Sequence, residues 1–211
     1  MHTKSFELLE TLLWEPGEGF FLLDRHLRRL GRTADHFGYA FARDAVLAQL
    51  RAAVKEQDEP QRVRLRLAPG GHARVEACPV GGLPAVIRVA PATEAVNRDN
   101  EFLDHKTTCR RVYDAARQSR PFADDVVLFD RVGRVTETTI ANIVLDRDGQ
   151  HVTPVGPGLL PGVYREHLLE EAQLVEDDIS LGELRSASRF WLINSVRRWM
   201  PAEWVDAAGK A

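Results

Sequence analysis

The pattern of apolar and polar positions along the chain predicts an α+β protein. Near the N-terminus, two apolar strands flank a turn-rich stretch at residues 15–19. Apolar residues at helical spacing follow at residues 23–37 and again at about 44–57. Three later segments alternate or run apolar, as strands do. They are "RVRLRLA", "ARVEA" and "AVIRVA".

The second half of the chain repeats this mixture after an aperiodic segment. Residues 92–104 show no clear period, so we expect an interdomain loop there. It would join a small N-terminal α+β domain, residues 1–91, to a larger C-terminal domain, residues 105–211. In the C-terminal domain the pattern predicts helices near residues 110–118 and 163–172. A Gly/Pro-rich loop precedes the helix near residues 163–172. The predicted strands of this domain are "DVVLFD", "RVTET", "IANIVLD" and "FWLIN".

Composition narrows the classes of function. Hydrophobic residues at 44% and charged residues at 28% are typical of a globular protein. A net charge of -3 and a pI near 6.2 give no reason to expect nucleic acid or a membrane surface as a partner. Cys78 and Cys109 form neither a metal-ligand cluster nor a disulfide framework. We therefore expect no metal, no membrane span and a cytoplasmic location.

One lysine stands out because the chain otherwise uses arginine for positive charge. Among the 28 basic residues the lysines are Lys4, Lys55, Lys106 and Lys210. Lys106 lies in the polar, non-repetitive stretch "DHKTTCRRVYD". Its amine can form a Schiff base with an aldehyde, which a guanidinium cannot do. Taken alone, Lys106 could equally be an ordinary surface lysine.

Four motifs in order give this lysine a context. "RHLRRL" is followed by "HKTTCRRVYD", "VTETTIANIVL" and "TPVGPGLLPGVYRE". Together they resemble the class IV aminotransferases, which are pyridoxal 5'-phosphate enzymes of fold type IV. The family includes branched-chain and D-amino acid aminotransferases and 4-amino-4-deoxychorismate lyase. The resemblance implies the two-domain, D-amino acid aminotransferase-like α+β fold and pyridoxal 5'-phosphate as cofactor.

The resemblance assigns the central chemistry to two residues. Lys106 matches the family's Schiff-base lysine, which carries protons once the substrate amine has displaced it. Glu137, in "VTETT", matches the carboxylate that keeps the pyridine nitrogen protonated. Without the resemblance, Glu137 would be interpreted as an exposed strand glutamate.

Further positions match the family's phosphate site. Arg29, in "RHLRRL", matches the phosphate-binding arginine. Gly162 precedes a predicted helix, so the backbone N–H groups of Val163 and Tyr164 would point at the phosphate. Ser195, in "LINSVRR", matches a late Ser or Thr whose hydroxyl reaches the same group. Read alone, Arg29 would lie on a solvated helix face and Ser195 would simply end a strand.

Two positions bear on the substrate. Thr11, in "LLETL", falls where lyase-type members have a threonine near the reacting lysine, whereas a strand-face threonine is the alternative. Arg64 matches a strand arginine that faces the active site and would bind a substrate carboxylate. Arg62 and Arg66 lie on the same strand face, where we expect solvent contact.

These matches favour a 4-amino-4-deoxychorismate lyase that releases 4-aminobenzoate and pyruvate in folate biosynthesis. The alternatives are a class IV aminotransferase acting on branched-chain, aromatic or D-amino acids, and a protein that keeps the fold without the chemistry. The presence of both Lys106 and Glu137 argues against the last. The resemblance also implies a homodimer and a functional link to aminodeoxychorismate synthase. The sequence has no counterpart of the "YGDG"-like segment that often precedes the family's "ET", so we expect no cofactor contacts of that kind.

Overall fold

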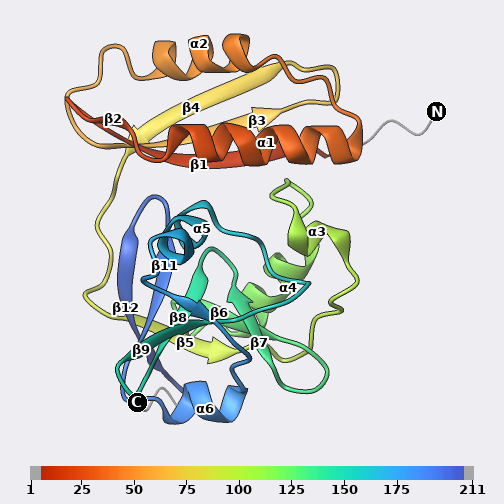
Figure 1. Ribbon diagram of the computed structural model, residues 1–211, viewed down its shortest axis with the longest axis vertical. Coiled ribbons are helices and arrows are strands. Elements are labelled where there is room, and N and C mark those ends of the chain that lie inside the picture. Colours follow the sequence, from red (N-terminus) through yellow and green to blue (C-terminus); the bar gives the residue numbers. More distant parts are fainter. Residues whose placement is uncertain (1–5, 207–211) are drawn as a thin grey trace. The chain divides into compact units, whose positions relative to one another are not determined.

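The computed structural model describes residues 6–206, and their contacts divide into two compact units (Figure 1). The first unit contains the described residues up to Gly82, together with His105–Cys109. The second contains Leu83–Asp104 and the described residues from Arg110 onward. Both units mix helices and strands, which confirms the α+β class predicted from the sequence.

The first unit is a four-stranded antiparallel sheet with two helices. The strand order is β2-β1-β3-β4. Helix α1 contacts β1, and α2 contacts β4 and β3 (Figure 1). The elements are β1 (Leu8–Glu15), β2 (Gly19–Phe20), α1 (Leu23–Phe37), α2 (Arg43–Ala53), β3 (Gln61–Leu67) and β4 (Ala73–Pro79).

Alternation along β3 gives this sheet two chemically different faces. Leu8, Leu12 and Leu65 are fully buried on the face that packs against the helices. Thr11 and Arg64 lie between them, are paired in register, and are only partly buried. Because successive side chains of a strand point to opposite faces, Thr11 and Arg64 share the face turned away from α1 and α2.

The second unit is built on an eight-stranded mixed sheet. Its order is β10-β9-β8-β11-β12-β5-β6-β7. The strands are β5 (Ile87–Pro91), β6 (Asp125–Phe129), β7 (Val135–Thr138), β8 (Asn142–Arg147), β9 (Gln150–Thr153), β10 (Val175–Glu176), β11 (Phe190–Asn194) and β12 (Arg198–Trp204). The helices are α3 (Glu101–Asp104), α4 (Arg111–Ser119), α5 (Val163–Glu170) and α6 (Leu181–Ser186). Residues of β5 to β9, β11 and β12 form its largest apolar core, against which α6 packs.

The division into units differs from the predicted boundaries at two places. Strand β5, predicted to belong to the N-terminal domain, pairs with β6 and β12 of the second unit. His105–Cys109, predicted to open the C-terminal domain, belongs to the first unit because Thr107 pairs with Leu8 of β1. Both differences arise from long-range strand pairing, which the local periodicity of a sequence does not encode.

Every predicted helix and strand is present, with shifted ends, but five elements were not predicted. They are α3, β9, β10, α6 and β12. Strand β12 contains Pro201, which argues against a strand between two neighbours because proline lacks a backbone N–H. The sheet accommodates it because β5 pairs with β12 only from Ala202 onward, whereas β11 pairs with Arg198–Ala202.

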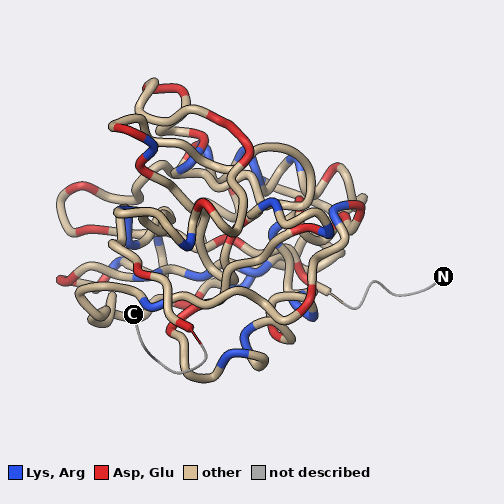
Figure 2. The backbone as a smooth tube through the Cα atoms, turned by 90° about the horizontal axis from the view of Figure 1, so that it is seen from below, with Lys and Arg blue, Asp and Glu red and all other residues tan. Residues whose placement is uncertain are grey.

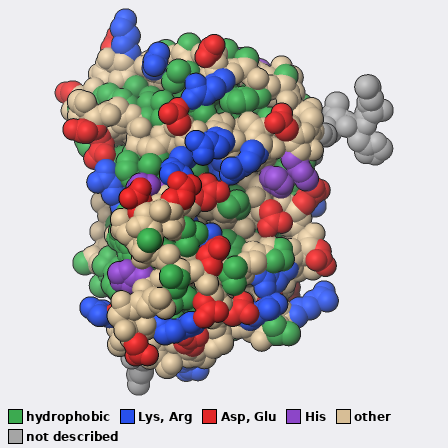
Figure 3. All heavy atoms as spheres, viewed as in Figure 1, with side chains coloured by type: hydrophobic (Ala, Val, Ile, Leu, Met, Phe, Trp, Pro, Cys, Tyr) green, Lys and Arg blue, Asp and Glu red, His purple; other side chains and the backbone are tan. Residues whose placement is uncertain are grey.

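Charged residues of both signs are interspersed along the chain and on the face shown in space-filling form (Figures 2 and 3). This distribution agrees with the small net charge of -3. Among residues 6–206, no helix combines the length and the apolar character needed to cross a membrane.

Candidate active site

Lys106 lies at the edge of the first unit's sheet. Its carbonyl oxygen accepts a hydrogen bond of 2.9 Å from the backbone N–H of Leu9. Its neighbours point towards α1, since Thr107 is buried and the ring of His105 stacks on His36 with centroids 4.2 Å apart. Because side chains alternate along an extended segment, Lys106 points to the opposite face. There it shares the sheet face of Thr11.

The polar residues that we use to define this face, which we call the polar sheet face, are Thr11, Arg62, Arg64, Arg66, Glu76 and Lys106; Leu9, Leu13, Arg74 and Cys78 lie on the same face. Arg64 is central in it, because it pairs with Thr11 on one side and with Glu76 on the other. The Nε atom of Arg64 is buried and has no hydrogen-bond partner among the described residues. The structure thus places the predicted catalytic and substrate-binding residues of this unit on one surface.

Arg29, the predicted phosphate-binding arginine, is held by a carboxylate that the sequence analysis did not single out. Its Nε donates to Glu10 Oε1 at 2.8 Å, and one terminal nitrogen donates to Glu10 Oε2 at 2.6 Å. Both side chains are almost completely buried. Burial alone raises the pKa of Glu10, but the charge and hydrogen bonds of Arg29 outweigh it and lower that pKa to about 2. Arg29 is therefore rigidly oriented rather than solvated.

His26 completes this buried cluster. Its Nδ1 lies 2.7 Å from Glu10 Oε2, and its Nε2 is buried without a hydrogen-bond partner among the described residues. Burial lowers the pKa of His26, and the positive charges of Arg29 and Lys106 act in the same direction, against the opposing effect of Glu10. A neutral imidazole thus lies within electrostatic reach of Lys106. We call Glu10, His26 and Arg29 the buried charge cluster.

In the second unit, Glu137 lies on β7 and is only 3% exposed. The interpretation of Glu137 as an exposed strand glutamate is therefore excluded. The phenol of Tyr113, on α4, donates to Glu137 Oε1 at 2.7 Å. The backbone N–H of Leu160 donates to the same oxygen at 3.2 Å. A buried carboxylate with two donors on one oxygen has a fixed orientation.

The start of α5 has the geometry of an anion site. Gly162 is the N-cap residue and has no side chain to cap the helix, so the backbone N–H groups of its first turn, where Val163 and Tyr164 lie, form the positive end of the helix. A Cβ atom at position 162 would overlap Asn142 Oδ1, so any larger residue requires the Asn142 side chain to shift. The Nδ2 of Asn142 donates to the carbonyl of Leu160 at 3.0 Å, which fixes the loop before the helix.

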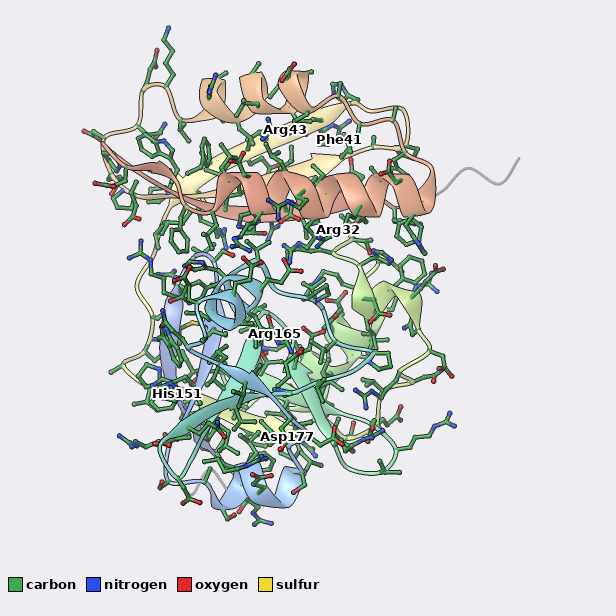
Figure 4. All side chains as sticks on the ribbon, viewed as in Figure 1. Arg32, Phe41, Arg43, His151, Arg165 and Asp177 are labelled. Carbon is green, nitrogen blue, oxygen red and sulfur yellow. The ribbon has the colours of Figure 1, made fainter. Side chains whose placement is uncertain are left out.

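Arg165 anchors the same helix from inside the second unit (Figure 4). Its guanidinium donates to the carbonyl of Pro154 at 2.6 Å, to Glu176 at 2.5 Å and to the hydroxyl of Thr153 at 3.2 Å. Ser195 directly follows β11, and the pairing of Ile193 with Asn142 puts it at the strand end where β8 begins. Gly162 lies against the side chain of Asn142, so the first turn of α5 lies near this end.

The predicted site residues thus form two groups, one in each unit. Thr11, Arg29, Arg64 and Lys106 belong to the first unit, and Glu137, Val163, Tyr164 and Ser195 belong to the second. The sequence analysis missed Glu10 and His26. A signal for them exists, because His26 precedes Arg29 by one helical step of three residues and Glu10 is a charged residue between the apolar pairs of a strand.

Comparisons with known proteins place the chain in a family. The pattern that describes the family "Amino-transferase class IV" matches residues 7–204. The Schizosaccharomyces pombe protein named "Putative aminodeoxychorismate lyase" is 34% identical over 92% of this chain and 88% of its own length. The crystal structure of a "Putative amino-acid aminotransferase" from Mesorhizobium loti is 37% identical, with a TM-score of 0.89 over 95% of this chain and all of that one.

A third comparison concerns the fold alone. The crystal structure of a "Putative 4-amino-4-deoxychorismate lyase" from Legionella pneumophila has a TM-score of 0.84 at 20% identity, over 95% of this chain and 83% of that one. Since the family pattern spans almost the entire chain, this protein belongs to the class IV aminotransferase family, and its fold is the fold of that family.

Proposed function

We propose that this protein is a pyridoxal 5'-phosphate-dependent 4-amino-4-deoxychorismate lyase that releases 4-aminobenzoate and pyruvate. The observation that carries the proposal is the polar sheet face, where the amine of Lys106 shares a surface with Thr11 and Arg64. The similarity to the Schizosaccharomyces pombe protein supports the same reaction.

The residues present fit a pyridoxal phosphate. The face holds a primary amine, and the second unit holds a buried carboxylate and a helix that begins after a glycine with no capping side chain of its own. Two solved structures of Mycobacterium tuberculosis proteins with this fold are described as "PLP-bound" and as bound to "alpha-ketoglutarate and PMP". Lys106 would hold the aldehyde, Glu137 the ring nitrogen, and Arg29, Val163, Tyr164 and Ser195 the phosphate.

The bound cofactor supplies an electron sink for the charge left when a proton departs from the carbon bearing the substrate amine. Lys106 removes that proton and can return it to the departing enolpyruvate. Arg64 binds a substrate carboxylate and thereby orients the ring against Lys106. The hydroxyl of Thr11, on the same face, holds a water that can donate this proton in place of Lys106. Loss of pyruvate makes the ring aromatic, so no external amino acceptor takes part.

A transaminase is the second candidate, favoured by the 37% identity to the Mesorhizobium loti protein. It would use the same Lys106 and Glu137, but it would leave the cofactor in its amine form until a second substrate arrived. Amino-donor half-reactions followed by absorbance would detect it. A lyase, in contrast, returns to its starting form after each turnover.

The deciding experiment is release of 4-aminobenzoate and pyruvate from freshly generated aminodeoxychorismate by the purified, cofactor-loaded protein. We expect equal amounts of both products, lost in Lys106→Ala and retained in Lys55→Ala, a control in which the exposed Lys55 is replaced. Protein that binds the cofactor but releases neither product would refute the lyase, and amino-donor turnover would then establish the transaminase.

We extend the proposal to assembly and supply. The protein would act in the cytoplasm as a homodimer, which light scattering coupled to size-exclusion chromatography can test. Its substrate would come from an aminodeoxychorismate synthase, and coupled assays with added synthase would test that functional link.

A further inference from the structure

The side chain of Tyr113 is placed to act on the site through Glu137. Tyr113 lies on α4 and is 7% exposed, and its phenol reaches across to β7, where it donates to Glu137 Oε1 at 2.7 Å. The bond joins two buried groups 24 positions apart in the sequence. A buried tyrosine hydroxyl usually finds a partner, but a carboxylate partner makes this bond charge-assisted and stronger.

Arg110 holds the ring of Tyr113 from the other side. Its guanidinium carbon lies 4.6 Å from the ring centroid. One of its terminal nitrogens donates to the carbonyl of Thr139 at 2.6 Å, just beyond the end of β7. The start of α4 is thus tied to the strand that carries Glu137, and the phenol has a fixed approach to it.

The phenol keeps its proton and acts only as a donor. Burial raises the pKa of Tyr113 far above its ordinary value, and the negative charge of Glu137 raises it further. The backbone N–H of Leu160 supplies a second donor to Oε1. Two donors on one oxygen stop the rotation that a glutamate carboxylate otherwise has about its last torsion.

We propose that Tyr113 is a positioning residue: it fixes the Glu137 carboxylate so that the second oxygen of that carboxylate meets the ring nitrogen of the cofactor. The inference rests on the proposed function, since it requires pyridoxal phosphate in this site. It adds a residue that acts through Glu137 and touches neither the substrate nor the reacting atoms.

The test compares two cofactors in two proteins. Pyridoxal 5'-phosphate and an analogue with CH in place of the ring nitrogen are titrated by absorbance into wild type and Tyr113→Phe. The ratio of the two dissociation constants measures the contact with the ring nitrogen. We expect Tyr113→Phe to reduce this preference about tenfold, as for loss of a hydrogen bond to a charged group. It should weaken binding of the analogue very little.

Tyr39→Phe is the matched control. Tyr39 is also buried, at 6% exposed, but its phenol donates to the backbone carbonyl of Phe6 in the first unit. We expect its preference to equal that of wild type. If Tyr113→Phe weakens the binding of both cofactors equally, Tyr113 has only a structural role and the proposal fails. An increased preference for pyridoxal 5'-phosphate in Tyr113→Phe would also overturn the proposal, since Tyr113 would then weaken the contact between Glu137 and the ring nitrogen.

A second pair of variants keeps the test decisive if Tyr113→Phe does not fold. Glu137→Gln removes the buried charge, and the double variant Glu137→Gln/Tyr113→Phe removes its donor as well. We expect these two proteins to share the same low preference, and a further loss in the double variant would contradict the proposal. Wild type that binds neither cofactor would refute the proposed function itself, and the inference with it.

Discussion

The buried charge cluster of Glu10, His26 and Arg29 makes the sharpest prediction about stability. Replacing Glu10 by Gln keeps the size and most hydrogen-bonding atoms of the side chain but leaves the charge of Arg29 buried and uncompensated. The pKa of Glu10 falls from 4.5 to about 2 on folding. At 1.36 kcal/mol per pKa unit, this shift of about 2.5 units corresponds to about 3 kcal/mol of stability near pH 7.

The same magnitude follows from mutations in other proteins, where breaking a buried ion pair costs about 3–5 kcal/mol. We therefore expect Glu10→Gln to lower the free energy of unfolding by about 3 kcal/mol at pH 7, measured by urea denaturation followed by circular dichroism. Glu18→Gln makes the same chemical change in the exposed turn after β1 and should stay within about 0.5 kcal/mol of wild type.

The pH dependence of the stability difference between wild type and Glu10→Gln can refute this prediction. Because the folded pKa of Glu10 is depressed, its contribution is fully present above pH 4.5 and disappears as the pH falls towards 2. The difference in stability between wild type and Glu10→Gln should therefore narrow over this range. A difference below about 1 kcal/mol at pH 7, or one that does not change between pH 5 and pH 3, would refute the charge-pair argument.

Three further predictions follow from the same structure. Gly162→Ala should lower the free energy of unfolding, measured in denaturant titrations, by about 1–3 kcal/mol because the new Cβ overlaps the side-chain amide of Asn142. The control Gly70→Ala places its Cβ where no atom lies within 4 Å and should leave the free energy of unfolding unchanged. Burial lowers the pKa of His26 from 6.5, so stability should fall as the pH drops through 6.5, and His26→Gln should flatten that part of the urea profile. Arg64→Met should raise KM by about 10- to 100-fold and Arg62→Met should not, and equal effects in steady-state kinetics would contradict the assigned contact.

The sequence predicted the fold well where local periodicity and turn chemistry agree. Strand β3 alternates polar and apolar residues, β1 leads into a Pro-Gly turn, and the helical spacing of Leu27, Leu30 and Phe37 defines α1. Elements were missed where that signal is weak. Strand β10 has two residues, both exposed, and β12 contains Pro201. Pairing with distant strands, rather than local preference, makes these segments strands.

The sequence proposes residues for the candidate site but not the contacts that hold them. Motif matching pointed to Lys106, Glu137 and Arg29, because the role proposed for each position requires a particular functional group. It could not reveal that Glu10 orients Arg29, or that Tyr113 donates to Glu137. These contacts join residues 19 and 24 positions apart through the packing of a helix on a sheet. The spacing along a sequence does not specify such contacts before the fold is known.

The central claim is that Lys106 is the amine that holds the cofactor. Borohydride reduction of the pyridoxal 5'-phosphate-loaded protein fixes the cofactor to that amine, and digestion with mass spectrometry then locates it. The account predicts one cofactor per chain on the peptide that contains Lys106, and none on Lys55. Cofactor attached to another lysine, or none retained by protein that showed cofactor absorbance before reduction, would contradict the account.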